Sequence, residues 1–207
     1  MVVLDATMLM ALFRPDAGGP TDSKGKPINE AKERIEYFVK QIEIAKTKII
    51  IPTPALSEIL VRLGAQASQD IVDEINRSAV WRIESFDTKA AIEVAAMTRA
   101  AIAAGGKKGE SSKASWAKVK YDRQIVAIAK VAQATAIYSD DDDVKSIGKS
   151  VGIPVISFAE LPLPPEAAQK ELPLAAPVEP LLVDPNDIEI EDELKQEIQT
   201  PEPPPGE

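Results

Sequence analysis

The sequence predicts an α/β fold: one domain over residues 1–161 in which helices cover both faces of a central parallel sheet. Short apolar runs of strand length alternate with longer segments whose apolar residues recur at helical spacing. Strands separated by helices form parallel sheets that are covered on both faces. The composition changes sharply at residue 162, so we expect the domain to end there.

Five short runs rich in apolar residues are the predicted strands. The second run is closed by Pro52, which cannot donate a hydrogen bond to a neighbouring strand. The third alternates in polarity, as a strand with one more exposed face does. The five runs are Val2–Leu4, Lys48–Ile51, Val80–Phe86, Ala136–Ser139 and Pro154–Ile156.

Seven segments between and after these runs are predicted to be helices. One has Pro54 in its first turn and Thr53 as its N-cap, and an alanine-rich one ends at Gly105. Thr21–Asn29 is polar and contains glycine and proline, so we expect a loop there. The predicted helices are Ala6–Phe13, Glu30–Lys46, Pro54–Leu63, Ser68–Ser78, Thr88–Ala104, Trp116–Gln133 and Asp143–Ser150.

Residues 162–207 are predicted to form an acidic, proline-rich tail. They hold 11 of the 17 prolines and have 12 Asp and Glu against 2 Lys, a net charge of −10, which leaves +1 for residues 1–161. Proline at this density interrupts helices and central strands, so we expect the tail to be disordered. The acidity of the chain belongs to the tail and does not argue against a nucleic-acid ligand of the domain.

The composition excludes several kinds of chemistry. The chain has no Cys and no His, which removes disulfides, thiolate and imidazole metal ligands and the Ser-His-Asp triad. No apolar run is long enough to cross a membrane. Met1–Leu12 is apolar but contains Asp5 and lacks a basic leader, so we expect no signal peptide, no membrane and a cytoplasmic location. Hydrolytic chemistry would depend on carboxylates, hydroxyls, lysines or a bound ion.

Acidic residues at particular places are the candidate site. Asp5 follows the first predicted strand, where α/β folds bind ligands, although an N-cap for the next helix explains it equally well. Glu58 borders an apolar helical stripe, and an exposed ion pair with Arg62 at i+4 is the simpler explanation. Asp122 lies on a stripe with Ile125 and Val126, where a carboxylate is costly unless it is paired or binds a metal; helix capping is the alternative.

Four consecutive aspartates follow the fourth predicted strand and precede a helix. A helix N-terminus favours one or two acids, so the whole run of Asp140–Asp143 exceeds what capping needs. Neighbouring carboxylates repel each other unless a cation neutralises them. Ligand sets made only of oxygen favour Mg²⁺ or Mn²⁺ over Zn²⁺.

The order of these motifs resembles the PIN-domain family, and more closely its branch of VapC-type toxin ribonucleases. The matching segments are Leu4-Asp5-Ala6-Thr7 after the first strand, Glu58 in TPALSEIL, Asp122 in YDRQIVAIAKV, and Ser139 with Asp140–Asp143 before GIPVIS. The resemblance covers residues 1 to about 160. Thr7 stands where the family has Asn or Ser, and the segment between Asp5 and Glu58 is longer than in compact toxins.

The resemblance implies a three-layer PIN-like fold and a metal-dependent endoribonuclease whose products carry a 5′-phosphate and a 3′-hydroxyl. It implies that the catalytic and metal-binding acids are Asp5, Glu58, Asp122 and Asp141, with Asp143 as a further metal ligand and Asp140 as the other choice. It implies Mg²⁺ or Mn²⁺ as cofactor and RNA as substrate. An antitoxin protein and a second copy of the chain, forming a homodimer, are the expected partners.

A basic segment before Asp122 is the expected substrate-binding surface. Lys113 and Lys118 would hold the RNA backbone, Thr7 and Ser139 would also contact the substrate, and Trp116 or Tyr121 would stack on a base. A solvated loop with a core-packed Trp116 explains the same residues equally well. The alternative for the whole chain is a PIN-like RNA-binding or scaffold module without catalysis. The tail either competes with RNA for these lysines or is solvated and recruits a partner through Leu181–Ile190.

Overall fold

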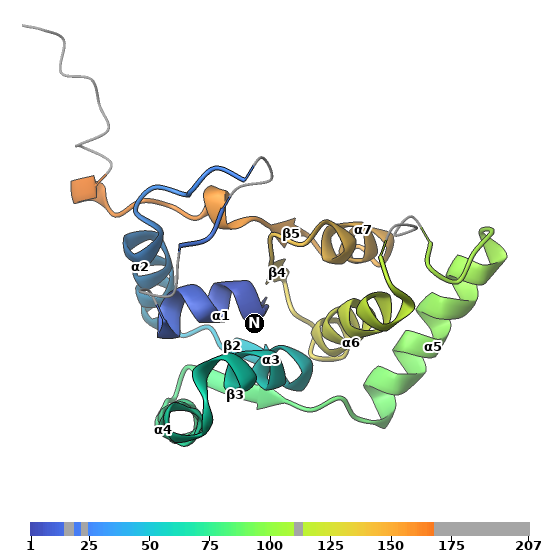
Figure 1. Cartoon of the computed structure of the whole chain (residues 1–207), viewed down its shortest axis with the longest axis horizontal. Coiled ribbons are helices and arrows are strands. Elements are labelled where there is room, and N and C mark those ends of the chain that lie inside the picture. The colour runs from blue at the N-terminus through green and yellow to red at the C-terminus, as the bar shows by residue number, and fades with distance from the viewer. Residues whose placement is uncertain (15–18, 22–24, 110–113, 168–207) are drawn as a thin grey trace, which may run out of the picture. The chain divides into compact units, whose positions relative to one another are not determined.

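A parallel sheet of five strands forms the centre of the protein (Figure 1). The computed structural model describes residues 1–14, 19–21, 25–109 and 114–167. The strand order is β3-β2-β1-β4-β5, and every neighbouring pair is parallel. The strands are β1 (Val2–Leu4), β2 (Ile49–Pro52), β3 (Trp81–Glu84), β4 (Ala136–Tyr138) and β5 (Val155–Ile156). The predicted α/β class is confirmed.

Helices connect the strands, as the apolar spacing predicted. Two details differ. The helix predicted to begin at Ser68 begins at Ala65. Thr53 is the first residue of its helix, and its hydroxyl accepts a hydrogen bond from the Phe86 backbone N–H in place of capping the helix. The helices are α1 (Ala6–Phe13), α2 (Ala31–Ile44), α3 (Thr53–Leu63), α4 (Ala65–Arg77), α5 (Thr88–Ala103), α6 (Trp116–Val131), α7 (Asp142–Ser150) and the 3₁₀ turn η1 (Phe158–Glu160).

The burial of the central strands shows that both faces of the sheet are covered. Side chains of successive strand residues point to opposite faces. Val3 and Leu4 in β1, and Ile49, Ile50 and Ile51 in β2, are all fully buried. A layer of helices therefore lies on each face, which confirms the predicted arrangement of a sheet between two helical layers.

The strand register brings two distant segments together at the carboxyl edge of the sheet. Leu4 at the end of β1 pairs with Tyr138 at the end of β4. Asp5 and Ser139 follow these residues directly, and the Asp5 backbone N–H donates to the Tyr138 carbonyl at 3.2 Å. Helix α7 begins just after β4 and packs beside α6, as Figure 1 shows. The sheet edge and the start of α7 thus provide one platform for a site.

Buried side chains lie on both sides of the domain boundary expected after residue 161, which stays a prediction. Leu161 and Ala167 are both buried. The predicted tail from residue 168 onward lies outside the described residues, as do parts of the predicted loop Thr21–Asn29. Among the described helices, none is both long enough and apolar enough to span a membrane.

Candidate metal centre

Asp5 uses both carboxylate oxygens at the end of β1. Oδ1 caps α1 by accepting the backbone N–H groups of Thr7 at 3.0 Å and Met8 at 3.2 Å. Oδ2 accepts a short hydrogen bond from the Ser139 hydroxyl. Burial raises the pKa of Asp5 from 3.8 to about 6, against the opposing effect of these hydrogen bonds. Asp5 can therefore cap α1 and belong to the site at the same time, because the two roles use different oxygens.

Ser139 links Asp5 to the beginning of α7. Its side chain is fully buried, and its Oγ donates to Asp5 and accepts the Asp141 backbone N–H at 3.1 Å. A buried hydroxyl with both functions engaged has no surface for RNA. The structure places Ser139 as a residue that positions Asp5 and Asp141, and the predicted contact with substrate has no support in this geometry.

The start of α7 carries two of the candidate ligands. Asp141 is the N-cap, and its Oδ1 accepts the backbone N–H groups of Asp143 at 2.8 Å and Val144 at 3.3 Å. Asp143 lies in the first turn. The helix dipole and the exposed backbone N–H groups favour negative charge here, so they partly offset the repulsion between the two neighbouring carboxylates.

Asp122 reaches the same place from α6. Its side chain is buried on the helical stripe that includes Val126, as the spacing predicted. Burial raises the pKa of Asp122 from 3.8 to about 6; the Lys118 hydrogen bond opposes this rise and the charge of Asp141 adds to it. A buried carboxylate with a raised pKa beside further acids is typical of a functional site.

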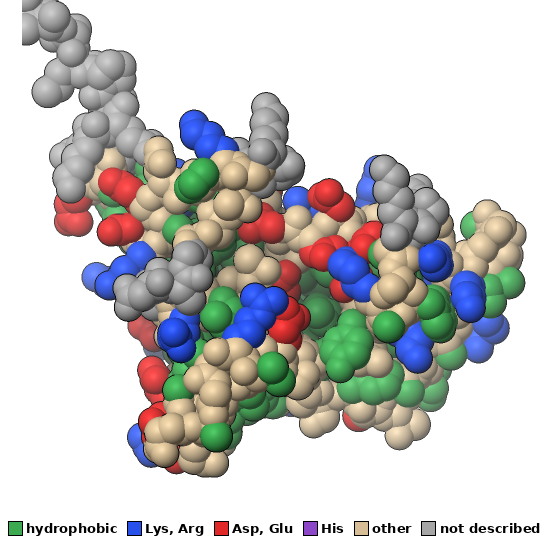
Figure 2. All heavy atoms as spheres, in the orientation of Figure 1, with side chains coloured by type: hydrophobic (Ala, Val, Ile, Leu, Met, Phe, Trp, Pro, Cys, Tyr) green, Lys and Arg blue, Asp and Glu red, His purple; other side chains and the backbone are tan. Residues whose placement is uncertain are grey.

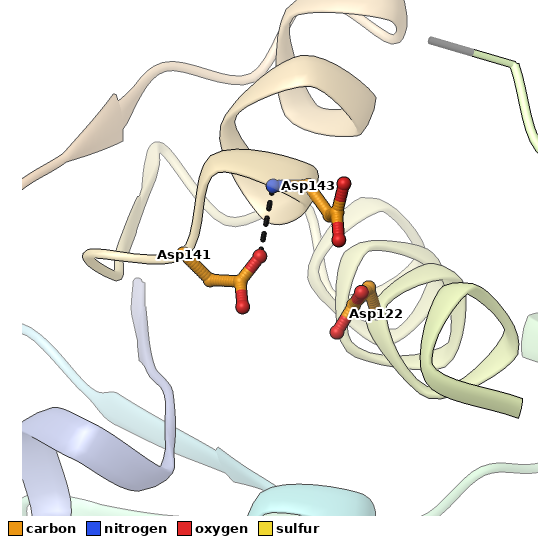
Figure 3. A group of neighbouring side chains, drawn as sticks. All are labelled: Asp122, Asp141 and Asp143. Carbon is orange, nitrogen blue, oxygen red and sulfur yellow. Dashed lines mark hydrogen bonds between the residues drawn. The ribbon is translucent and has the colours of Figure 1, made fainter. Parts of the chain in front are cut away.

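Three carboxylates converge between α6 and α7. Asp122, Asp141 and Asp143 each offer an oxygen, and the three oxygens lie within 4.8 Å of one another. Figure 3 shows these side chains turned toward one another, with the Asp141–Asp143 hydrogen bond dashed. A donor set of three carboxylate oxygens fits a hard divalent cation such as Mg²⁺ or Mn²⁺.

The ammonium group of Lys118 contacts all three acids. Its Nζ lies 3.0 Å from Asp122 Oδ2, 2.8 Å from Asp141 Oδ2 and 2.6 Å from Asp143 Oδ2. Burial alone would lower the pKa of Lys118, but the hydrogen bonds to the three aspartates raise it above its usual value. The structure thus places Lys118 on the acids, whereas we had expected it to hold the RNA backbone.

The other two aspartates of the run have different surroundings. Asp140 is half-buried, and its Oδ1 accepts the Phe158 backbone N–H at 2.8 Å. Its Oδ2 is buried without a hydrogen-bond partner among the described residues, and burial raises the pKa of Asp140. Asp142 is exposed and pairs with Lys145 at 3.5 Å. Neither belongs to the group of three acids.

Glu58 is exposed on α3 and pairs with Arg62 at 2.6 Å. This is the i,i+4 ion pair that the sequence offered as the simpler explanation. Asp5 and Glu58 are not members of the group of three, so the structure assembles part of the expected acid set.

A cleft of about 480 Å³ adjoins the acids. Thr7, Arg14 and Arg62 line it together with Asp140 and Asp141. Thr7 is exposed there, in a position to meet a ligand. Figure 2 shows acidic and basic side chains side by side near the middle of the visible face. Guanidinium groups bind phosphate oxygens in bidentate fashion, so the cleft combines anion-binding groups with carboxylates.

The basic segment before Asp122 is only partly described. Lys113 lies outside the described residues. Trp116 is half-buried, with Lys107 Nζ 5.0 Å and the Arg123 guanidinium carbon 5.5 Å from the centre of its ring. Tyr121 is 51% exposed and has room to stack on a base. Two cationic groups thus lie against the ring of Trp116, which favours Tyr121 as the base-stacking residue.

Two features of the site were not predicted from the sequence: the two arginines that line the cleft, and the contact of Lys118 with the acids. Arg14 and Arg62 in the cleft carry no motif signal, because their approach depends on how α1 and α3 pack. Lys118 did carry a signal: it precedes Asp122 by one helical turn, the spacing at which side chains on a helix meet.

The comparisons with known proteins gave likenesses of structure only. No protein-family model and no curated protein matches the chain. The sarcin-ricin loop cleaving toxin VapC20 of Mycobacterium tuberculosis is 14% identical, with a TM-score of 0.44 over 72% of this chain and 95% of that chain.

Two toxin–antitoxin complexes are similar to the same degree. VapBC2 of Rickettsia felis, bound to a DNA fragment from its promoter, is 13% identical, with a TM-score of 0.47 over 76% of this chain and 98% of that one. DNA-bound VapBC of Salmonella typhimurium is 15% identical, with a TM-score of 0.46 over 76% and 97%. At these values the function has to be argued from the chain's own residues.

Proposed function

We propose that this chain is a Mg²⁺- or Mn²⁺-dependent endoribonuclease of the PIN-domain kind. The observation that carries the proposal is the convergence of Asp122, Asp141 and Asp143 within 4.8 Å, from two helices that meet at the carboxyl edge of a parallel sheet. Oxygen ligands in this number suit a hard divalent ion, and the chain has no His or Cys to offer in their place.

The three acids have the role of metal ligands, and Asp5 has a supporting place. Asp5 holds Ser139, and Ser139 in turn holds the Asp141 backbone, so Asp5 fixes the start of α7. The resemblance to VapC-type toxins also assigns Asp5 and Glu58 to the catalytic and metal-binding acids. We therefore keep both residues in the proposed site. An ion bound by these carboxylates would lower the pKa of an attacking water and neutralise charge on the phosphate.

The cleft beside the acids has the properties that an RNA backbone needs. Arg14, Arg62 and Thr7 line it, and the Arg62 guanidinium also pairs with Glu58. Single-stranded RNA is bound through phosphate contacts and base stacking, and Tyr121 is exposed for the latter. The proposed substrate is therefore single-stranded or looped RNA. The proposed location of the reaction is the cytoplasm.

We further propose that this ribonuclease is the toxin of a toxin–antitoxin pair. It rests on the resemblance of the four acid motifs to VapC-type toxins. An antitoxin protein would then be a partner of the chain, and a small gene for a DNA-binding protein beside its own would support this proposal. A housekeeping nuclease with the same site would lack such a neighbour.

The decisive experiment compares an aspartate of the cluster with an exposed aspartate outside it. Asp122→Asn removes a clustered charge, and we expect it to lower Mn²⁺-dependent cleavage of single-stranded RNA at least about 100-fold. Asp142→Asn makes the same change at an exposed carboxylate outside the cluster and should cleave like the wild type. Circular dichroism would confirm that both variants are folded.

Two results would contradict the proposal. Equal cleavage by wild type and Asp122→Asn would remove Asp122 from the active site. Wild-type protein that binds RNA without cleaving it at saturating Mn²⁺ would favour the alternative, an RNA-binding or scaffold module that has no catalysis.

A further inference from the structure

Lys118 occupies the position that a cation bound by the three acids would take. Its ammonium lies 2.6–3.0 Å from one oxygen of Asp122, of Asp141 and of Asp143. These residues are also the group whose oxygens suit a metal ion. The same negative charge is therefore available to two different cations.

Local structure directs Lys118 to this place. It lies one turn before Asp122 on α6, in a helix whose start is capped by the Ser115 hydroxyl, which accepts the Lys118 backbone N–H at 3.1 Å. The packing of α6 beside α7 then brings Asp141 and Asp143 to the same ammonium. The next lysine of α6, Lys120, is exposed, and Lys145 of α7 pairs with Asp142 outside the cluster.

We propose that Lys118 is the internal counter-ion of the metal-free site and that a divalent ion binds by displacing its ammonium. This inference rests on the proposed function, because it concerns the same metal site. Mg²⁺ binds carboxylate oxygens at about 2.1 Å. An ammonium held within 3.0 Å of the same oxygens would lie against the ion, where two positive charges repel strongly.

The exposure of Lys118 makes the exchange feasible. Its side chain is 42% exposed, so the ammonium has solvent into which to move when an ion enters. In the metal-free protein it offsets one of the three negative charges and so reduces the repulsion among the carboxylates. The apparent affinity for metal is lowered by the fraction of molecules in which Lys118 occupies the site.

The test is calorimetric titration of the full-length, metal-free protein with Mn²⁺. Lys118→Met removes the ammonium, and we expect it to bind Mn²⁺ about tenfold more tightly than wild type. Lys120→Met makes the same change of net charge on the exposed side of α6 and should stay within about twofold. Lys118→Gln, which keeps a polar side chain, serves as the second variant if Lys118→Met does not fold.

A thermal measurement provides an independent reading. Without metal, Lys118→Met should unfold at a lower temperature than wild type, because the ammonium no longer offsets the repulsion among the three carboxylates. Saturating Mn²⁺ should remove most of this difference, since the ion then supplies the charge in both proteins.

The outcomes separate this inference from the proposed function. Mn²⁺ binding that is equal or weaker in both Lys118 variants would overturn the displacement model and leave the metal site standing. Absence of Mn²⁺ binding in wild type and in both variants would overturn the metal site, and the displacement model with it.

Discussion

Asp5 shows how a single side chain serves a helix and a site together. One of its oxygens caps α1, and the other is bound by Ser139, whose hydroxyl in turn accepts the Asp141 backbone N–H. A buried carboxylate is costly in its charged form, and its pKa is accordingly raised to about 6. The same residue that orders the local backbone therefore carries a proton more readily than an exposed aspartate does.

This pKa predicts how the stability of the metal-free protein depends on pH. A carboxyl group with a raised pKa binds its proton more tightly in the folded state, so folding is favoured below the unfolded pKa of 3.8 and this advantage is lost as pH rises through about 6. A rise of this size corresponds to about 3 kcal/mol. Between pH 4 and pH 7 in EDTA, the thermal midpoint of wild type should fall more steeply than that of Asp5→Asn.

A matched control is available for that measurement. Asp142→Asn makes the same substitution at an exposed carboxylate of α7 and should follow the wild-type curve. Parallel curves for wild type and Asp5→Asn would show that Asp5 does not take up a proton in this range.

At the scale of the element, α7 depends on a close approach to the neighbouring strand. Gly148 lies inside α7 and is buried against β5. A Cβ added to it would overlap Val155 Cγ2 and lie 3.0 Å from the Ile153 carbonyl oxygen, which is backbone and cannot move aside cheaply. Glycine is poor for helix stability, so its presence here is explained by packing.

We predict that Gly148→Ala destabilises the protein. The overlap should cost about 1–3 kcal/mol and outweigh the better helix propensity of alanine. The thermal midpoint should fall by roughly 3–10 °C. Gly106→Ala is the control, since a Cβ there meets nothing within 4 Å and should leave the midpoint almost unchanged. A midpoint in Gly148→Ala equal to or above that of wild type would contradict the packing argument.

At the scale of the molecule, α5 offers an unusual surface. Ile92 and Ile102 on this helix are 61% and 57% exposed, among many alanines. Large exposed apolar side chains along one helix are the kind of surface through which proteins bind one another. The resemblance predicts a homodimer, and α5 offers a surface through which the two copies could pair.

We predict a homodimer that forms through α5. Light scattering at high protein concentration should give twice the monomer mass for wild type. The double variant Ile92→Lys/Ile102→Lys should give the monomer, because lysines facing each other across a two-fold interface repel. Val61→Lys changes an exposed apolar residue on α3 and should remain dimeric. A monomeric wild type would refute the prediction.

The distribution of charge also belongs to this scale. Residues 162–207 carry a net charge of −10 and the remainder +1. The whole-chain charge of −9 therefore describes neither part. A nearly neutral domain with arginines in its cleft is compatible with an RNA ligand. This becomes clear only when the charge of residues 1–161 is counted separately from that of residues 162–207.

The sequence by itself determined the elements and the class of the fold. Strand and helix depend on neighbours within a few residues, so the periodicity of apolar side chains was sufficient to place β1, α6 and α7 with small errors at their ends. It also placed Asp122 on a buried stripe and indicated that Asp5 follows a strand. The pairing of Glu58 with Arg62 was available for the same reason, since the two are one helical turn apart.

Only the tertiary structure decided which side chains meet. Asp122 and Asp141 share a site because α6 packs beside α7, and Ser139 reaches Asp5 because β4 pairs with β1 in one register. Contacts of this kind join residues far apart in the chain and depend on packing of whole elements, which no local pattern encodes. Lys118, which we had expected to bind RNA, shows both sides: its helical spacing from Asp122 is readable in the sequence, but its contacts with Asp141 and Asp143 required the fold.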